Sequence, residues 1–202
     1  MGDAAVDVTP DDVDEVAAAM ARAFADDGMF TFVFPDPARR PARLDRFFRG
    51  AVRYGHLCGH GLTTPDRAGG AIWLPPGSTS MSALGMLRSG MLAFPATLGP
   101  GAFRRFVAYT SWLDGQRAAL VPDPHWFLLA LGVDPSRQRS GIGTSLLAPM
   151  LDDADRRGLP TYLETTSEAN VAYYARAGFE VVRDAVPDTG PRTWLMMRAP
   201  TP

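Results

Sequence analysis

Two glycines in the second half of the chain are spaced so that they could bind a phosphate group. They lie in the segment Gln138-Arg139-Ser140-Gly141-Ile142-Gly143, between an apolar run at residues 125–133 and a helical pattern from Thr144 to Arg157. Because glycine has no Cβ, a ligand can come close to its backbone N–H group. The first N–H groups of a helix have no partner within the helix, and the helix dipole favours an anion there. The segment therefore predicts a pyrophosphate-binding loop at a helix N-terminus.

Two familiar nucleotide-binding loops do not fit this segment. A dinucleotide-binding turn has the pattern G-x-G-x-x-G directly after its strand, but here the third glycine position is Leu146 and residues 134–140 separate the apolar run from Gly141. A P-loop needs Gly-Lys followed by Ser or Thr, and the sequence contains no lysine. The motif that remains is Gln138-x-x-Gly141-x-Gly143.

The elements that must position this loop can be read from the apolar spacing. Residues 125–133 are predicted to form a buried strand, and apolar residues at 146, 147, 150 and 151 mark one face of the helix that follows. A strand at 161–165 should run parallel to the strand at 125–133, because a helix joins the two. The rest of this half is predicted as a short helix at 168–177, ended by Gly178, and strands at 179–183 and 193–198.

The first half of the chain is predicted to supply the remaining helices and strands. Thr9 is a candidate N-cap and Pro10 suits the first helical position, after a short strand at 5–8. Apolar spacing then predicts helices up to Phe24 and at 42–60, an aromatic-rich loop at 25–41, strands at 62–64 and 71–74, and covering helices at 80–89 and 103–120.

The composition is that of one globular domain and gives no sign of a nucleic-acid or membrane partner. The 202 residues are 46% hydrophobic and 21% charged, and the formal net charge of −2 lacks the basic excess that phosphate-backbone binding needs. No apolar run approaches the roughly 20 residues of a membrane-spanning helix. The acidic segment Met1–Asp7 lacks the order of a signal peptide, and Cys58 is the only cysteine, so no internal disulfide can form. We therefore expect a cytoplasmic protein that is a monomer or a homodimer.

Two separated signatures resemble those of the GNAT superfamily of N-acetyltransferases. One is Gln138-x-x-Gly141-x-Gly143, and the other is the run from Leu163 through Asn170 and Tyr174 to Gly178-Phe179. The predicted order of elements is also similar to that of the superfamily. The resemblance implies an α/β fold with a central mixed, mostly antiparallel sheet, a splayed parallel strand pair and flanking helices. It further implies a single domain over residues 1–202 with an acyl-CoA-binding core at about 125–180.

A closer resemblance is to the puromycin N-acetyltransferase type of actinomycete enzymes. It rests on stretches such as Ala71-Ile-Trp-Leu74, Leu163-Glu-Thr165 and Gly190-Pro-Arg-Thr-Trp194. The similarity spans most of the chain but is best after Pro124, so the acceptor substrate is not carried over.

The resemblance implies that acetyl-CoA is the co-substrate and that no metal is needed. The glycine loop would hold the pyrophosphate through its amides, and the end of the 125–133 strand would pair with the pantetheine arm. An N–H of that strand, expected to be that of Val133, would polarise the thioester carbonyl. The residues expected to bind acetyl-CoA are Leu131, Gly132, Val133, Gln138, Arg139, Ser140, Gly141, Ile142, Gly143, Thr144, Asn170 and Tyr174.

The resemblance also implies a proton donor and a base. Tyr174 would donate a proton to the leaving thiolate, and Glu164 would take a proton from the amine, directly or through water. Each residue also has a plainer interpretation. Tyr174 could be a core aromatic, as its neighbour Tyr173 is expected to be, and Glu164 could be a solvated or structural carboxylate. We expect Tyr174→Phe and Glu164→Gln each to lower turnover by more than about tenfold while leaving acetyl-CoA affinity largely intact.

Candidate acceptor-binding residues come from the first half and from the central strand. Asp26 and Asp27 follow the first predicted helix and could attract a cationic amine, although a solvated loop would explain them equally well. Phe30, Trp73 and Trp126 could line an apolar acceptor pocket, although each could equally be core.

Two other chemistries are not favoured by the residue pattern. The spacing His56-x-Cys58-x-His60 raises the question of zinc, but on a helix Cys58 points away from the two histidines and no fourth ligand is evident. Cys58 is also the only thiol that could carry an acetyl group, and it lies far from both signatures in the sequence, so direct attack is preferred to a covalent intermediate.

The function predicted from the sequence is transfer of acetyl from acetyl-CoA to an amine, with a small molecule such as an aminonucleoside-like compound or another amine xenobiotic as acceptor. Two alternatives stay open. One is a non-catalytic acyl-CoA sensor, and the other is a protein N-acetyltransferase, which would need a wide groove where the insert at 78–121 suggests a covered pocket.

Overall fold

The chain is organised around one mixed sheet. The computed structural model describes residues 4–121 and 124–201, so part of the acidic N-terminal segment lies outside the described residues. Within this part the strand order is β1-β2-β3-β4-β5-β7-β6, and every neighbouring pair is antiparallel except β4 and β5. The strands are β1 Val6–Asp7, β2 His60–Thr63, β3 Gly69–Leu74, β4 Trp126–Val133, β5 Thr161–Thr165, β6 Glu180–Ala185 and β7 Thr193–Arg198. The expected mixed, mostly antiparallel sheet is confirmed.

The one parallel pair separates partway along its length. β4 and β5 pair only from Trp126 with Thr161 to Leu128 with Leu163. Beyond this point β4 stays with β3 as far as Val133, while Glu164 and Thr165 of β5 pair only with β7. The β3–β4 register also shifts between Ile72 and Trp73, and a register shift of this kind bends a strand. A gap therefore opens between the carboxyl ends of β4 and β5, as a splayed pair requires.

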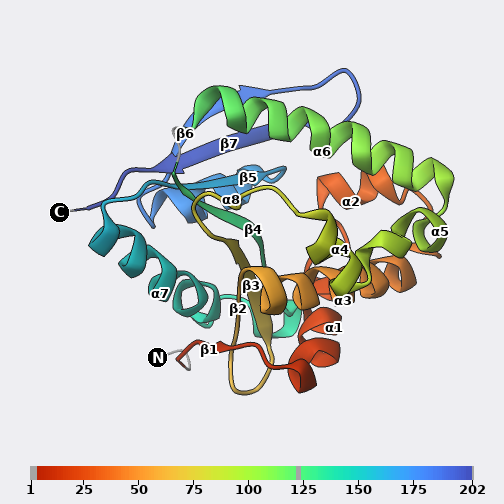
Figure 1. The fold of residues 1–202 in the computed structure, drawn as a ribbon, viewed down its shortest axis with the longest axis horizontal. Helices are drawn as coiled ribbons and strands as arrows, with labels where there is room; N and C mark the ends of the chain where they lie inside the picture. The colour runs from red at the N-terminus through yellow and green to blue at the C-terminus, as the bar shows by residue number, and fades with distance from the viewer. Residues whose placement is uncertain (1–3, 122–123, 202) are drawn as a thin grey trace.

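Helices cover both faces of this sheet, and Figure 1 shows α6 and α7 on opposite sides of it. Alternation along each strand sends neighbouring side chains into two separate cores. One core contains Ile72 and Phe127 and packs against α1 and α3, and the other contains Trp73 and Trp126 and packs against α7. The helices are α1 Val13–Ala23, α2 Gly28–Val33, α3 Arg40–Cys58, α4 Ala83–Ser89, α5 Phe94–Leu98, α6 Pro100–Leu120, α7 Ile142–Arg157 and α8 Glu168–Ala175.

Two short helices were not expected from the sequence. The predicted loop at 25–41 contains α2, where the Asp27 carboxylate accepts the backbone N–H groups of Met29 and Phe30 at 3.0 and 3.4 Å. The insert at 78–121 contains α5, whose proline lies in the first turn and which ends at Gly99 with a φ of 84°. Neither helix is long enough to show a helical period, so α2 depends on its Asp27 cap and α5 on the turn at Gly99.

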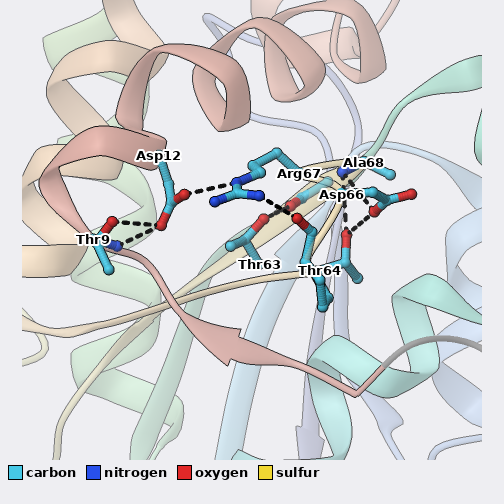
Figure 2. A network of polar contacts seen from close by, with 9 residues as sticks. Thr9, Asp12, Thr63, Thr64, Asp66, Arg67 and Ala68 are labelled. Atoms are coloured by element: carbon cyan, nitrogen blue, oxygen red, sulfur yellow. Dashed lines mark hydrogen bonds and ion pairs between the residues drawn. The ribbon is translucent and has the colours of Figure 1, made fainter.

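A polar network holds the start of α1 against the turn between β2 and β3 (Figure 2). Asp12 accepts hydrogen bonds from the backbone N–H and the hydroxyl of Thr9 at 2.9 and 2.7 Å, and it pairs with Arg67 at 2.7 Å. These donors lower the pKa of Asp12, the Thr9 hydroxyl contributing most. In the turn, the Thr64 hydroxyl donates to Asp66 at 2.7 Å. The network therefore fixes both the predicted Thr9 cap and the turn that leads into β3.

None of the helices in the described part of the chain is long and apolar enough to cross a membrane.

Candidate active site

The predicted phosphate loop lies at the N-terminus of α7. Gly141 precedes the helix with a φ of 89°, and Arg139 also has a positive φ, of 60°. No side chain of the described residues caps this end of α7. Because the first N–H groups of a helix lack internal acceptors, those of the first turn are free to receive an anion, and Thr144 there is exposed. This geometry suits the expected pyrophosphate site.

Gly143 lies where α7 meets α8. A Cβ on Gly143 would be 2.6 Å from the Tyr173 hydroxyl oxygen, closer than side chains tolerate. Close packing of two helices is therefore one reason for glycine at this position. Without a side chain, the backbone of Gly143 can also be approached closely by a ligand. Glycine at this position is therefore compatible both with close helix packing and with phosphate binding.

The segment that leads into the loop is tied to the rest of the fold by ion pairs. Asp134 accepts hydrogen bonds from the backbone N–H and hydroxyl of Ser136 and pairs with Arg22 of α1 at 2.6 Å. These contacts, those to Ser136 foremost, lower the pKa of Asp134 to about 2. Arg137 pairs at 2.7 Å with Asp66, the residue of the β2–β3 turn shown in Figure 2. The loop thus starts from a fixed position relative to α1 and β3.

The end of β4 presents backbone groups to the gap between β4 and β5. The Asp134 N–H donates to Ala68 on the β3 side at 2.8 Å. Since backbone groups alternate in direction along an antiparallel strand, the N–H groups of Leu131 and Val133 face the opposite side, toward the gap. The Val133 carbonyl accepts the side-chain amide of Gln138 at 3.2 Å. Gly132 faces β3 and α1 instead, and a Cβ there would be 2.9 Å from the ring of Phe24.

A cavity of about 480 Å³ adjoins this gap. Its sheet side is formed by Leu128–Leu131 of β4 and by residues 163–166 at the end of β5, and its other walls come from α2, α3 and the insert that carries α4–α6. A volume in this range is usual for a small-molecule site. The cavity brings together residues that are far apart in the sequence, including Glu164, Asn170 and Tyr174.

Glu164 is a largely buried carboxylate in the cavity wall. Its side chain is only 12% exposed, accepts a hydrogen bond from the Tyr162 hydroxyl at 3.0 Å, and lies 3.7 Å from the guanidinium of Arg117. Burial raises the pKa of Glu164 to about 7, although the nearby Arg117 and the Tyr162 hydrogen bond act in the opposite direction. A carboxylate with a pKa near neutrality is suited to accept a proton at physiological pH.

Arg117 is a cavity residue that the sequence did not identify. It lies on α6, is 6% exposed in its side chain, pairs with Asp114 at 2.5 Å, and stacks over the Phe127 ring at 4.3 Å. Only the three-residue spacing between Asp114 and Arg117 hinted at a pair, and such pairs are usually on the surface. Its burial depends on how α6 lies over the sheet.

Tyr174 reaches the cavity from the opposite face of the sheet. Its ring packs with Tyr173 at 5.1 Å and with Phe179 at 5.9 Å in the core that contains α7, and the side chain also lines the cavity. Burial raises the pKa of the Tyr174 hydroxyl. The phenol therefore stays protonated at neutral pH and can act as a proton donor.

The structure separates the predicted acceptor residues into three groups. Phe30 and Asp27 line the cavity, and Asp27 also accepts the Thr166 hydroxyl at 2.8 Å. Burial raises the pKa of Asp27. Asp26 does not share this environment, because its side chain is 99% exposed. Trp73 and Trp126 are fully buried in the other core, since alternation along β3 and β4 turns them away from the cavity.

Asn170 and the histidines can also be placed. The Asn170 side-chain amide donates to the Thr165 hydroxyl at 3.4 Å, at the point where β5 ends. His56 Nδ1 lies 2.8 Å from the Val8 carbonyl oxygen, whereas His60 packs against Trp126, so the two do not converge. The described residues contain no group of three or more His, Cys, Asp or Glu side chains arranged to hold a metal.

Comparison with known proteins agrees with this geometry. Residues 100–179 match a family model described as Acetyltransferase (GNAT) family. The chain is 29% identical over 183 residues to an uncharacterized N-acetyltransferase of Schizosaccharomyces pombe, covering 87% of this chain and 74% of that protein.

Two solved structures share the fold over nearly the full length of the chain. One, described as histone acetyltransferase HPA2 and related acetyltransferase from Corynebacterium glutamicum, has a TM-score of 0.64 and 20% identity, covering 100% of this chain and 98% of that one. The other, arylalkylamine N-acetyltransferase 2 from Aedes aegypti, has a TM-score of 0.61 and 12% identity, covering 98% of each chain. The fold is the GNAT fold.

Proposed function

We propose that this GNAT-fold chain transfers acetyl from acetyl-CoA to the amine of a small molecule by direct attack. One observation carries the proposal. The gap between β4 and β5 lies between the uncapped N-terminus of α7 and a cavity whose wall holds Glu164 and Tyr174. A donor phosphate site, a place for an extended arm and two proton-transfer groups therefore meet at one opening in the sheet.

The donor would bind along the edge of β4. The pyrophosphate lies at the N–H groups of the first turn of α7, and the pantetheine amides pair with the backbone groups of Leu131 and Val133 that face the gap. The Val133 N–H then points toward the thioester carbonyl and stabilises the negative charge that develops on its oxygen. The exposed Asn170, at the end of β5, lies where it can contact the arm.

The transfer needs three proton movements, one to Glu164 and two through Tyr174. Glu164, as carboxylate, takes one proton from the ammonium, and the neutral nitrogen forms a bond to the carbonyl carbon. The carbon–sulfur bond breaks, and the sulfur takes a proton from Tyr174. The second proton that leaves the nitrogen returns to Tyr174, so the products are the acetamide and the free thiol. A thiol with a pKa of about 8.5 leaves as a thiolate basic enough to accept a proton from a nearby phenol.

Several observations favour a small amine over a protein acceptor. α2 and the insert with α4–α6 form the walls of the cavity, where a protein acceptor would need an open groove. The resemblance to the puromycin N-acetyltransferase type and the similarity to a structure named an arylalkylamine N-acetyltransferase support small amines as the first compounds to test. The presence of both Glu164 and Tyr174 at the gap favours an enzyme over an acyl-CoA sensor. A single cysteine supports a cytoplasmic enzyme.

The proposal is tested by measuring thiol release from acetyl-CoA with a panel of amines that includes puromycin, together with mass spectrometry of the products. We expect thiol release that depends on one or more amines and a product heavier by one acetyl group. Mass spectrometry of the enzyme after mixing with acetyl-CoA alone should show no acetylated protein. A covalent acetyl-enzyme would overturn direct attack, and amine-independent acetyl-CoA binding without thiol release would favour the sensor.

A further inference from the structure

The cavity has one apolar end and one charged end, and α6 runs along both. Phe106 lies in the N-terminal half of α6, whereas Asp114 lies eight residues later, about 12 Å further along the helix axis. Around Phe106 the wall is formed by rings and thioethers. Phe47 packs at 5.5 Å from Phe106 and at 5.3 Å from Phe94, and Met86, Met91 and Phe103 also line the cavity.

The charged end carries more negative than positive groups. Arg117 is the only cationic side chain that lines the cavity among the described residues, and it is shared between Asp114 at 2.5 Å and Glu164. One positive charge therefore faces the carboxylates of Asp27, Asp114 and Glu164. Asp27 accepts hydrogen bonds from neutral donors only, two backbone N–H groups and the Thr166 hydroxyl. Glu164 has a neutral donor in Tyr162 and lies 3.7 Å from Arg117. A single ammonium group at this end would offset the buried negative charge that the protein itself leaves uncompensated.

The apolar end is adaptable in shape. Methionine side chains are unbranched and flexible, and they line binding surfaces that accept ligands of different outline. Met81, Met86 and Met91 all lie in the cavity wall, and Met81 and Met86 are half-buried. By contrast, Asp27 and Glu164 at the charged end are fixed by hydrogen bonds. We therefore expect the site to fix the position of the ligand's amine and to accept apolar groups of different shape on the rest of the ligand.

We propose that the acceptors are primary amines with a single positive charge on a bulky apolar body that carries a ring, and that the enzyme accepts several such bodies. This inference rests on the proposed function and narrows its substrate class. It excludes polyamines and amino sugars, whose additional charged or polar groups would have to enter the apolar end. It also excludes free amino acids, whose carboxylate would meet the negative charge of Asp27 and Glu164.

The test compares kcat/KM for matched amines by thiol release from acetyl-CoA. We expect 2-phenylethylamine, 3-phenylpropylamine and 2-cyclohexylethylamine to differ among themselves by less than about tenfold, as an adaptable wall allows. Phenylalanine, which adds only a carboxylate to 2-phenylethylamine, should be at least about tenfold worse, as should spermidine and glucosamine. Equal or better kcat/KM for any of these three would overturn the inference while leaving the acetyltransferase function standing.

A pair of variants on α4 tests whether the cavity itself makes the selection. Met86 lines the cavity, whereas the next residue, Leu87, is 59% exposed and does not line it. Met86→Asp should raise the KM for 3-phenylpropylamine by at least about fivefold and leave the KM for acetyl-CoA unchanged, whereas Leu87→Asp should change neither. If Met86→Asp does not fold, Met81→Asp replaces it. No change of the amine KM in a folded cavity variant would contradict the inference.

A binding measurement separates the failure of this inference from the failure of the proposed function. The thermal midpoint of the wild-type protein is measured with each amine in the absence of acetyl-CoA. If the ring-bearing amines raise the midpoint, Met86→Asp abolishes the rise, and no amine releases thiol, then the cavity assignment stands and the acetyltransferase function fails. If no ring-bearing amine raises the midpoint or releases thiol, the inference is overturned.

Discussion

Glu164 lies on β5 with its carboxylate between the Tyr162 hydroxyl and the Arg117 guanidinium. Its neighbour Leu163 belongs to the core that packs against α7, so alternation sends Glu164 to the opposite face, where the tertiary packing forms the cavity. Burial raises its pKa to about 7, which makes the fraction of ionised carboxylate sensitive to pH in the physiological range. The role of Glu164 as the base can therefore be tested by pH as well as by substitution.

We expect kcat/KM for the amine to rise with pH through about 7 as Glu164 loses its proton, because only the carboxylate can accept one. Glu164→Gln should lower turnover by more than about tenfold and abolish the rise of kcat/KM with pH. The KM for acetyl-CoA should stay within about twofold of wild type. The measurement is the pH dependence of thiol release at saturating acetyl-CoA.

Glu168→Gln is the matched control, because Glu168 is exposed at the start of α8 and does not line the cavity. It should leave both the turnover and the rise of kcat/KM with pH unchanged. Full activity of Glu164→Gln would remove Glu164 from the mechanism.

Tyr174 can be tested without disturbing its packing. Tyr174→Phe keeps the ring between Tyr173 and Phe179 and removes only the hydroxyl. We expect turnover to fall by more than about tenfold at unchanged thermal midpoint, since the leaving thiolate loses its proton donor. Tyr173→Phe, the same change one residue earlier, should retain at least about half of the activity. Similar losses in the two variants would mean that the Tyr174 hydroxyl has no special part in the transfer.

At the scale of elements, the α7 N-terminus depends on how closely α8 packs against it. A Cβ at Gly143 would lie 2.6 Å from the Tyr173 hydroxyl oxygen but 3.4 Å from the ring carbon that bears it. Gly143→Ala should therefore raise the KM for acetyl-CoA several-fold by moving α8 or the first turn of α7. Adding Tyr173→Phe removes the clashing oxygen and should restore most of the affinity, which a double-mutant cycle measures.

Gly115→Ala is the control for an alanine at a helical glycine. Gly115 is exposed within α6, and nothing lies within 4 Å of its added Cβ. It should leave the acetyl-CoA KM unchanged and raise the free energy of unfolding by roughly 0.5–1 kcal/mol. If Gly143→Ala behaves like Gly115→Ala, the close approach of α8 is not what sets the geometry of the loop.

The longer helices and strands lie close to where the sequence predicted them, whereas the short helix α2 was not predicted. The helix after the glycines was expected from Thr144 and begins at Ile142, and the strand expected at 193–198 is β7. Both have a clear period and a glycine or proline boundary. α2 has only six residues, and its cap by Asp27 is reinforced by Thr166 from the far end of the chain. A contact of this kind leaves no mark in the local sequence.

At the scale of the whole molecule, two carboxylates with shifted pKa values make stability depend on pH in opposite directions. Glu164 has a folded pKa of about 7 against an ordinary value of 4.5, so the folded protein keeps a proton that the unfolded chain has released. Stability should therefore fall as pH rises from about 4.5 to 7. The pKa of Asp134 is about 2 in the folded protein and 3.8 ordinarily. Its contribution to the stability of the fold is therefore lost as pH falls from about 3.8 to about 2.

We expect the thermal midpoint to be higher at pH 5 than at pH 8, and calorimetry at the two values measures this. Glu164→Gln should reduce the difference, since an amide carries no charge to bury, whereas Glu168→Gln should not. An unchanged difference in Glu164→Gln would mean that other groups dominate the pH dependence.

The sequence by itself was enough to predict the proposed donor half of the site. Its motif Gln138-x-x-Gly141-x-Gly143, the spacing from Asn170 to Gly178, and the parallel order of β4 and β5 are local or follow from chain order. Periodicity and glycine spacing act over one element and its neighbours, so they can be read without coordinates. The gap at the end of β4 was expected from the resemblance and is present where β5 turns to pair with β7.

Only the tertiary structure decided which residues line the proposed acceptor half. The same alternation that hides Trp73 and Trp126 in one core turns Glu164 toward the other, and no local signal says which face has the cavity. Asp26 and Asp27 are adjacent in sequence, yet one faces solvent and the other the cavity. Arg117 is buried because α6 crosses the sheet above Phe127. These outcomes depend on long-range packing, because whether a side chain is buried depends on which helices pack against its face of the sheet and not on its neighbours in the sequence.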